Sequence, residues 1–137
     1  MIKLINNIYT TLGKFVDIPV LFLRIALAKI FWDSAQTKLP NWDNTVFLFA
    51  EEYKVPLISP EIAAYMATGV ELVAPVLLVL GLFTRFGAAM LLVLTAVIEF
   101  TYTHSDEHYM WAAVSLLLIT YGAGKISLDN LLKRKFG

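Results

Sequence analysis

The sequence contains no cysteine and only two histidines among its 137 residues. Without cysteine the chain has no disulfide, no thiolate nucleophile and no cysteine ligand for an iron–sulfur cluster, zinc or copper(I). It also lacks a glycine-rich nucleotide-binding motif, a nucleophile–base constellation, a haem-binding pair of buried histidines and a basic nucleic-acid-binding surface. These absences argue against a stand-alone enzyme and against a nucleic-acid partner.

Charged residues are scarce too, at 16%, whereas hydrophobic residues reach 58% and the mean hydropathy is +0.69. Soluble domains have about 25% charged and about 45–50% apolar residues. The composition therefore indicates an integral membrane protein, with the lipid bilayer as its main partner. A chain of this length has room for a single domain, 1–137, built as a small all-α bundle.

Four apolar segments have the length and pattern of transmembrane helices, and we expect spans at about 19–39, 62–83, 88–103 and 109–121. Residues 1–16 show helical periodicity and form either a short amphipathic helix on the membrane surface or a frayed end. The connection 41–60 has the same periodicity, which predicts a short interfacial helix in the first external loop. That helix is either a lid over the bundle or an aromatic anchor.

The basic residues predict the orientation of the spans. Seven of them fall on one predicted side: Lys3, Lys14, Arg85, Lys125, Lys133, Arg134 and Lys135. The other side has most of the acidic residues outside the spans and two lysines: Asp43, Glu51, Glu52, Glu61, Asp106, Glu107, Lys38 and Lys54. Basic residues gather on the cytoplasmic side of membrane proteins, so both termini should be cytoplasmic.

The candidate functional residues are the charged and polar side chains within the spans: Arg24, Lys29, Asp33, Glu71, Glu99 and Tyr102. Lys29 and Glu71 both lie near the middle of a span, so we expect them to form an ion pair. The spans contain two basic residues, Arg24 and Lys29, and three acidic ones: Asp33, Glu71 and Glu99. At least one of the acids therefore has no basic partner and should be protonated. The cluster either relays protons from the external side or only fixes how the helices pack.

The first span is unusually polar. Lys29, Asp33, Gln36 and Thr37 fall within one arc of roughly 100°, so this arc should face the interior of the bundle or water. Arg24 projects from nearly the opposite side of the helix, and its long side chain could reach the lipid headgroups.

Two histidines flank an acid in the turn that precedes the fourth span. His104, Asp106 and His108 could bind a metal ion or relay protons. The alternative is interfacial hydrogen bonding, with Ser105 as the N-cap of the next helix and acidic residues in its first turn.

Several segments resemble the DoxX family of small four-helix bacterial membrane proteins. They are LFLRIALAKIFW, SAQTKL, ELVAPVLLVLGLFTRFG and GAGKISLDNLL. The resemblance falls on Arg24, Lys38, Glu71, Gly81, Arg85, Ser127 and Asp129. The segment TKLPNWDNTVFLFAEEYKVPLISPEIAAY further resembles a branch of that family encoded beside copper-associated modified-peptide systems.

The resemblance implies a multi-pass protein of the bacterial inner membrane. It also implies an accessory or subunit role in a membrane oxidoreductase system, such as thiosulfate:quinone oxidoreductase or a superoxide-detoxifying assembly. In this interpretation the chain anchors a redox, metal-stress or oxidative-stress system, with a quinone head group near Glu71, Lys29 and Tyr102. Other protein subunits or further copies of the chain would be its partners.

Two other functions fit the same residues. In the first, the chain is a small transport or export component in which Asp33, Glu71, Glu99 and the external histidines relay protons or bind a cation. In the second, it recruits a soluble protein through its basic C-terminal tail.

Overall fold

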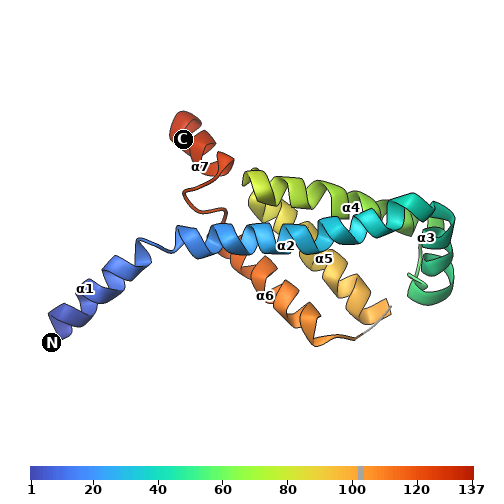
Figure 1. Ribbon diagram of the computed structural model, residues 1–137, viewed down its shortest axis with the longest axis horizontal. Helices are drawn as coiled ribbons and strands as arrows, with labels where there is room; N and C mark the ends of the chain where they lie inside the picture. Colours follow the sequence, from blue (N-terminus) through green and yellow to red (C-terminus); the bar gives the residue numbers. More distant parts are fainter. Residues whose placement is uncertain (102–103) are drawn as a thin grey trace.

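The computed structural model describes residues 1–101 and 104–137, and the regular elements in these ranges are all helical (Figure 1). The helices are α1 (Ile2–Gly13), α2 (Asp17–Lys38), α3 (Trp42–Leu48), α4 (Pro60–Leu80), α5 (Thr84–Thr101), α6 (Asp106–Tyr121) and α7 (Leu128–Phe136). A 3₁₀ turn, Leu39–Asn41, precedes α3, and a π-helical turn, Phe49–Tyr53, follows it. The predicted all-α class is confirmed.

Helices α2, α4, α5 and α6 form a bundle, in which α4 packs against α2 and α5, and α6 packs against α5 and α2. Small residues on the inner face of α4, including Ala64, Ala67 and Ala74, are buried and let the neighbouring helices approach closely. The core between them consists of larger side chains, among them Phe31, Leu78, Leu91 and Leu118.

The outer surface of the bundle is apolar. On α4, Val73, Val76 and Val79 are exposed, and on α5 Val93 and Phe100 are exposed. Large apolar side chains exposed along neighbouring helices mark a surface that contacts lipid or another protein. Two of the helices, α4 and α5, are long and apolar enough to cross a membrane by length and composition.

The two ends of the bundle differ in what they contain. Both termini, α7 and the turn between α4 and α5 lie at one end, which we call the inner end, and α3 lies at the other, the outer end (Figure 1). The elements at the inner end are those predicted to hold the seven cytoplasmic basic residues. The fold is thus compatible with the predicted orientation, which remains a prediction.

The two terminal helices lie outside the core. Helix α1 has no buried residue and projects away from the bundle (Figure 1), so the amphipathic helix is formed and the frayed end is not. Helix α7 was not predicted; Ser127 caps it by accepting a hydrogen bond from the backbone N–H of Asn130 at 3.1 Å. A helix is confirmed in the connection 41–60; its π-helical turn ends at Tyr53, with Lys54 in the left-handed conformation.

Candidate functional site

The centre of the candidate site is a buried ion pair between α2 and α4. Lys38 Nζ lies 3.0 Å from Glu71 Oε2 and 3.1 Å from Glu71 Oε1. The Glu71 side chain is only 2% exposed, so the pair is shielded from solvent. Lys38 is in the last turn of α2, where the helix dipole favours a cation.

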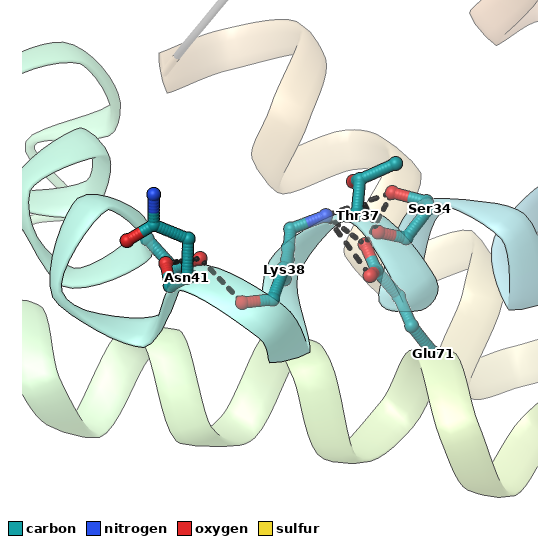
Figure 2. Close-up of polar contacts among 6 residues, drawn as sticks. Ser34, Thr37, Lys38, Asn41 and Glu71 are labelled. Atoms are coloured by element: carbon teal, nitrogen blue, oxygen red, sulfur yellow. Dashed lines mark hydrogen bonds and ion pairs between the residues drawn. The ribbon is translucent and has the colours of Figure 1, made fainter.

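Ser34 completes this pair, one helical turn before Lys38. Its hydroxyl accepts a hydrogen bond from Lys38 Nζ at 2.7 Å and donates one to Glu71 Oε1 at 3.3 Å. Thr45, in the middle of α3, donates from its hydroxyl to the Lys38 carbonyl at 3.0 Å. Figure 2 shows Glu71 reaching from α4 toward Lys38 and Ser34. The lysine is therefore held at its side chain and at its backbone, as expected for a positioned buried charge.

The predicted partner of Glu71 was wrong, because Lys29 bonds to Asp33 on its own helix instead. The two sides of α2 explain the difference. Lys29 and Lys38 are nine residues apart, so at about 100° per residue they project from opposite sides of the helix. Lys38 is on the buried side together with Arg24 and Ala35, whereas Lys29 is on the exposed side.

Glu71 lies between two cavities. The first, the apolar slot, has a volume of about 130 Å³ and lies between α4, α5 and the π-helical turn. Its lining includes Phe49, Met66, Val70, Val93 and Val97 besides Glu71. Met66 and Val93 are exposed on the outside of the bundle, so the slot borders the apolar outer surface.

The second cavity, the outer vestibule, has a volume of about 280 Å³ and reaches Glu71 from the direction of α6. This cavity is more polar than the slot. Its polar lining consists of Ser34, Tyr53, Glu71, Ser105, Glu107, His108 and Trp111, of which Tyr53 and Glu71 also line the slot. Tyr53 lines both cavities and is buried together with Phe49. The turn after α3 therefore covers the outer end of the site.

Glu99 organises the outer connection between α5 and α6. One carboxylate oxygen lies 2.9 Å from His104 Nδ1, and the other is hydrogen-bonded to His108 Nδ1 and to the backbone N–H of Ser105. His108 is only 6% exposed, because the first turn of α6 packs it beside Trp111. The predicted N-cap is confirmed, since Ser105 Oγ accepts from the Glu107 backbone at 3.3 Å.

The predicted metal ligands do not assemble. Within residues 1–101 and 104–137, no group of three or more histidine or acidic side chains is arranged to bind a metal ion. The two histidines converge on Glu99, which is not the acid between them in the sequence. Tyr102, another predicted site residue, lies outside the described residues.

Arg24 belongs to the inner end of the bundle and does not reach toward headgroups. It is 1% exposed, and its Nη2 donates to the Ile126 carbonyl at 2.7 Å. The prediction that Arg24 and Lys29 project from opposite sides of α2 is confirmed. Arg24 is on the buried side, however, and the arc with Lys29 is exposed, so the bundle-interior alternative for that arc is wrong. A stripe of residues could have shown this, because Arg24 shares a buried face of α2 with Ala28, Phe31, Ala35 and Lys38.

The segment before α7 folds back onto Arg24. Asp129 accepts hydrogen bonds from the backbone N–H groups of Phe83 at 2.7 Å and Thr84 at 2.9 Å, and so caps α5. Gly81, with φ +68°, lies against both Arg24 and Ser127. Four positions of the family resemblance, Arg24, Gly81, Ser127 and Asp129, therefore meet in one structural cluster, away from the Lys38–Glu71 pair.

Comparison with known proteins places this arrangement in a family. The sequence profile of the DoxX family matches residues 19–104, which include Lys38 and Glu71. A Haemophilus influenzae protein, described as uncharacterized, is 32% identical over 134 residues, with 87% of this chain and 86% of the relative covered. No solved structure matches the chain. Because the profile covers more than half of the sequence, the chain belongs to the DoxX family of membrane proteins.

Proposed function

We propose that this protein is a four-span accessory subunit of a membrane redox system and holds a quinone-type head group beside Glu71. The observation that supports this most directly is the position of one carboxylate between two cavities, the apolar slot and the outer vestibule. The spans are α2, α4, α5 and α6, with both termini in the cytoplasm of a bacterial inner membrane. The redox setting is inferred from the family resemblance, and the position of the head group is inferred from the two cavities beside Glu71.

The residues around Glu71 fit such a head group. A ring with two carbonyl oxygens needs an apolar slot with a few directed polar groups, and the slot offers aliphatic side chains together with Glu71 and Tyr53. A bound quinone would supply an acceptor for two electrons and two protons, with the electrons coming from a partner subunit. Lys38 and Ser34 hold the Glu71 carboxylate at the edge of the slot.

The outer vestibule gives Glu71 access to protons. His108 and Glu71 both line this cavity, and His108 is hydrogen-bonded to Glu99 near the outer end of α5. A neutral imidazole has one nitrogen that donates and one that accepts a hydrogen bond. Protons can thus reach Glu71 from the outer side through the vestibule, whereas the head group enters from the slot.

The test measures binding of a short-chain benzoquinone to the purified protein, followed by quenching of tryptophan fluorescence. Trp111 lines the vestibule and reports on the site. Glu71→Gln alone leaves Lys38 without its anion, so the double variant Lys38→Met/Glu71→Gln is also measured as a folded control. We expect both variants to lose binding and the exposed Glu61→Gln, on the same helix, to retain it. Wild-type binding by the double variant would overturn the quinone site.

Proton-linked transport is the second candidate, and the vestibule is the observation in its favour. It brings His108 and Glu71 into one cavity at the outer side. In proteoliposomes containing a pH-sensitive dye and no quinone, transport predicts a proton flux that Glu71→Gln abolishes. The quinone site predicts no such flux. Recruitment of a soluble partner would survive Glu71→Gln but not removal of residues 133–137.

A further inference from the structure

The polar arc of α2 faces outward from the bundle. Lys29 and Asp33 form an ion pair one helical turn apart, and their side chains are 74% and 58% exposed. Gln36 and Thr37 are exposed on the same arc, nearer the outer end. The arc was expected to face the bundle interior or water, but the buried face of α2 is the opposite one, which contains Arg24 and Lys38.

This arc is in an unfavourable place if α2 crosses the membrane, as the proposed function requires. Lys29 is about 18 Å from Asp17 and about 14 Å from Lys38 along the helix, so it lies near the middle of the hydrocarbon layer. Charged residues at that depth almost always face protein or a water-filled cavity. The Lys29–Asp33 pair neutralises its own charge, yet its remaining hydrogen-bonding groups still face outward. Either a water-filled cavity or another protein surface must therefore lie against the arc.

We infer that the surface covering it is the same arc of a second copy of this chain. Copies inserted in the same orientation have parallel α2 helices and can be related by a twofold axis along the membrane normal. Each arc presents one cation and one anion. A lysine ammonium has three donors, and in the described structure the Lys29 ammonium bonds to Asp33 Oδ2. Its other donors can reach Asp33 of the second copy, which gives a closed, neutral ring of four charges.

The surface beside the arc can accommodate the second copy. A groove of about 500 Å³ lies between α2 and α4, lined by apolar side chains that include Ile25, Trp32, Val76 and Val79, with Lys29 at its edge. Toward the inner end the same side of α2 is apolar, with Phe22 and Ile25 exposed. The surface thus combines an apolar inner half with a self-complementary charged centre, which fits a parallel copy of α2 better than a lipid acyl chain.

A charge-reversal experiment tests this pairing. Lys29→Asp gives a chain with two acids at the arc, and Asp33→Lys gives a chain with two bases. Each variant should lose its homodimer because like charges then meet. When the two are co-expressed with different affinity tags, we expect the heterodimer to exceed either homodimer by at least about tenfold. Equal amounts of all three species, or no dimer of the unaltered protein in mild detergent, would overturn the inference.

The absence of cysteine in the chain allows a second test in membranes. Gln36→Cys on the arc should form a disulfide-linked dimer under mild oxidation, whereas Val93→Cys on the exposed face of α5 should form no disulfide-linked dimer. Cross-linking of Gln36→Cys to a different protein would overturn the assignment to a second copy. Labelling of Ile25→Cys by a water-soluble maleimide would instead show that α2 is not in the membrane. Quinone binding is measured independently, so either proposal can fail alone.

Discussion

Gly81 is the residue at which α2, α4 and the segment before α7 meet. Its φ is +68°, and a Cβ there would overlap the Arg24 guanidinium and Ser127. We predict that Gly81→Ala destabilises the protein by about 1–3 kcal/mol through the backbone conformation alone, and by more through the overlap. Thermal unfolding in detergent, followed by circular dichroism, measures the loss.

Gly69→Ala is the matched control for this prediction. Gly69 lies within α4, and a Cβ there meets nothing within 4 Å. Alanine favours a helix over glycine by about 1 kcal/mol, so this variant should be neutral or slightly more stable. Equal losses from the two variants would show that the close packing at Gly81 has no energetic importance.

For Lys38 and Glu71 we predict that replacing one member of the pair destabilises the protein more than replacing both. Removing one member of a buried pair leaves an uncompensated charge, which costs about 3–5 kcal/mol, whereas replacing both costs much less. Lys38→Met should therefore unfold at a lower temperature than Lys38→Met/Glu71→Gln, although it has fewer substitutions. Lys3→Met, in helix α1, which has no buried residue, should change the unfolding temperature little in detergent. A double variant less stable than Lys38→Met would contradict the pairing.

At the residue scale the sequence identified Glu71 as a buried acid but not its partner. Depth along each helix was estimated from the span boundaries, and this favoured Lys29. The side of α2 that faces α4 decides the partner, and it depends on packing between helices that are distant in the sequence. Small residues at Ala28 and Ala35, between Arg24 and Lys38, were the available signal for the buried face.

At the scale of elements, Asp129 in α7 caps the start of α5, and this capping role can be tested by substitution. Its carboxylate accepts hydrogen bonds from two backbone N–H groups at the start of α5, and Asp129 N donates to the Gly81 carbonyl at 2.8 Å. Asp129→Ala should destabilise the protein by about 1–2 kcal/mol, the range for a lost helix cap. Asp106→Ala, in the first turn of α6, loses only a dipole interaction and should cost about 0.5 kcal/mol. Similar losses would contradict the capping role.

Long helices were easier to predict than short ones. The four bundle helices begin and end within a few residues of the predicted boundaries, because continuous apolar segments and prolines at helix starts are strong local signals. Helix α7 was missed because its nine residues are mostly polar and charged, and its first turn depends on Ser127 and on the docking of Asp129. Short helices of this kind are stabilised by tertiary contacts rather than by their own propensity.

At the scale of the whole molecule, the sequence predicted a membrane bundle from composition alone, and family membership agrees with it. The two spans supported by length and hydropathy are α4 and α5. Helix α2 is more polar because it contains both the buried face with Arg24 and Lys38 and the exposed pair Lys29–Asp33. Its place in the membrane therefore depends on what covers that pair, which no pattern within one chain can show.

Labelling of single cysteines distinguishes four spans from two. If α2, α4, α5 and α6 all cross, Asn44→Cys and Asp106→Cys should react with an impermeant maleimide in right-side-out spheroplasts, whereas Asn7→Cys and Lys135→Cys should react only after lysis. If only α4 and α5 cross, all four positions lie on one side and react together. The basic residues near Asn7 and Lys135 favour the first pattern, because positive charge is retained in the cytoplasm. Uniform labelling would place α2 and α6 outside the membrane, and the α2 pairing proposed above would lose its physical basis.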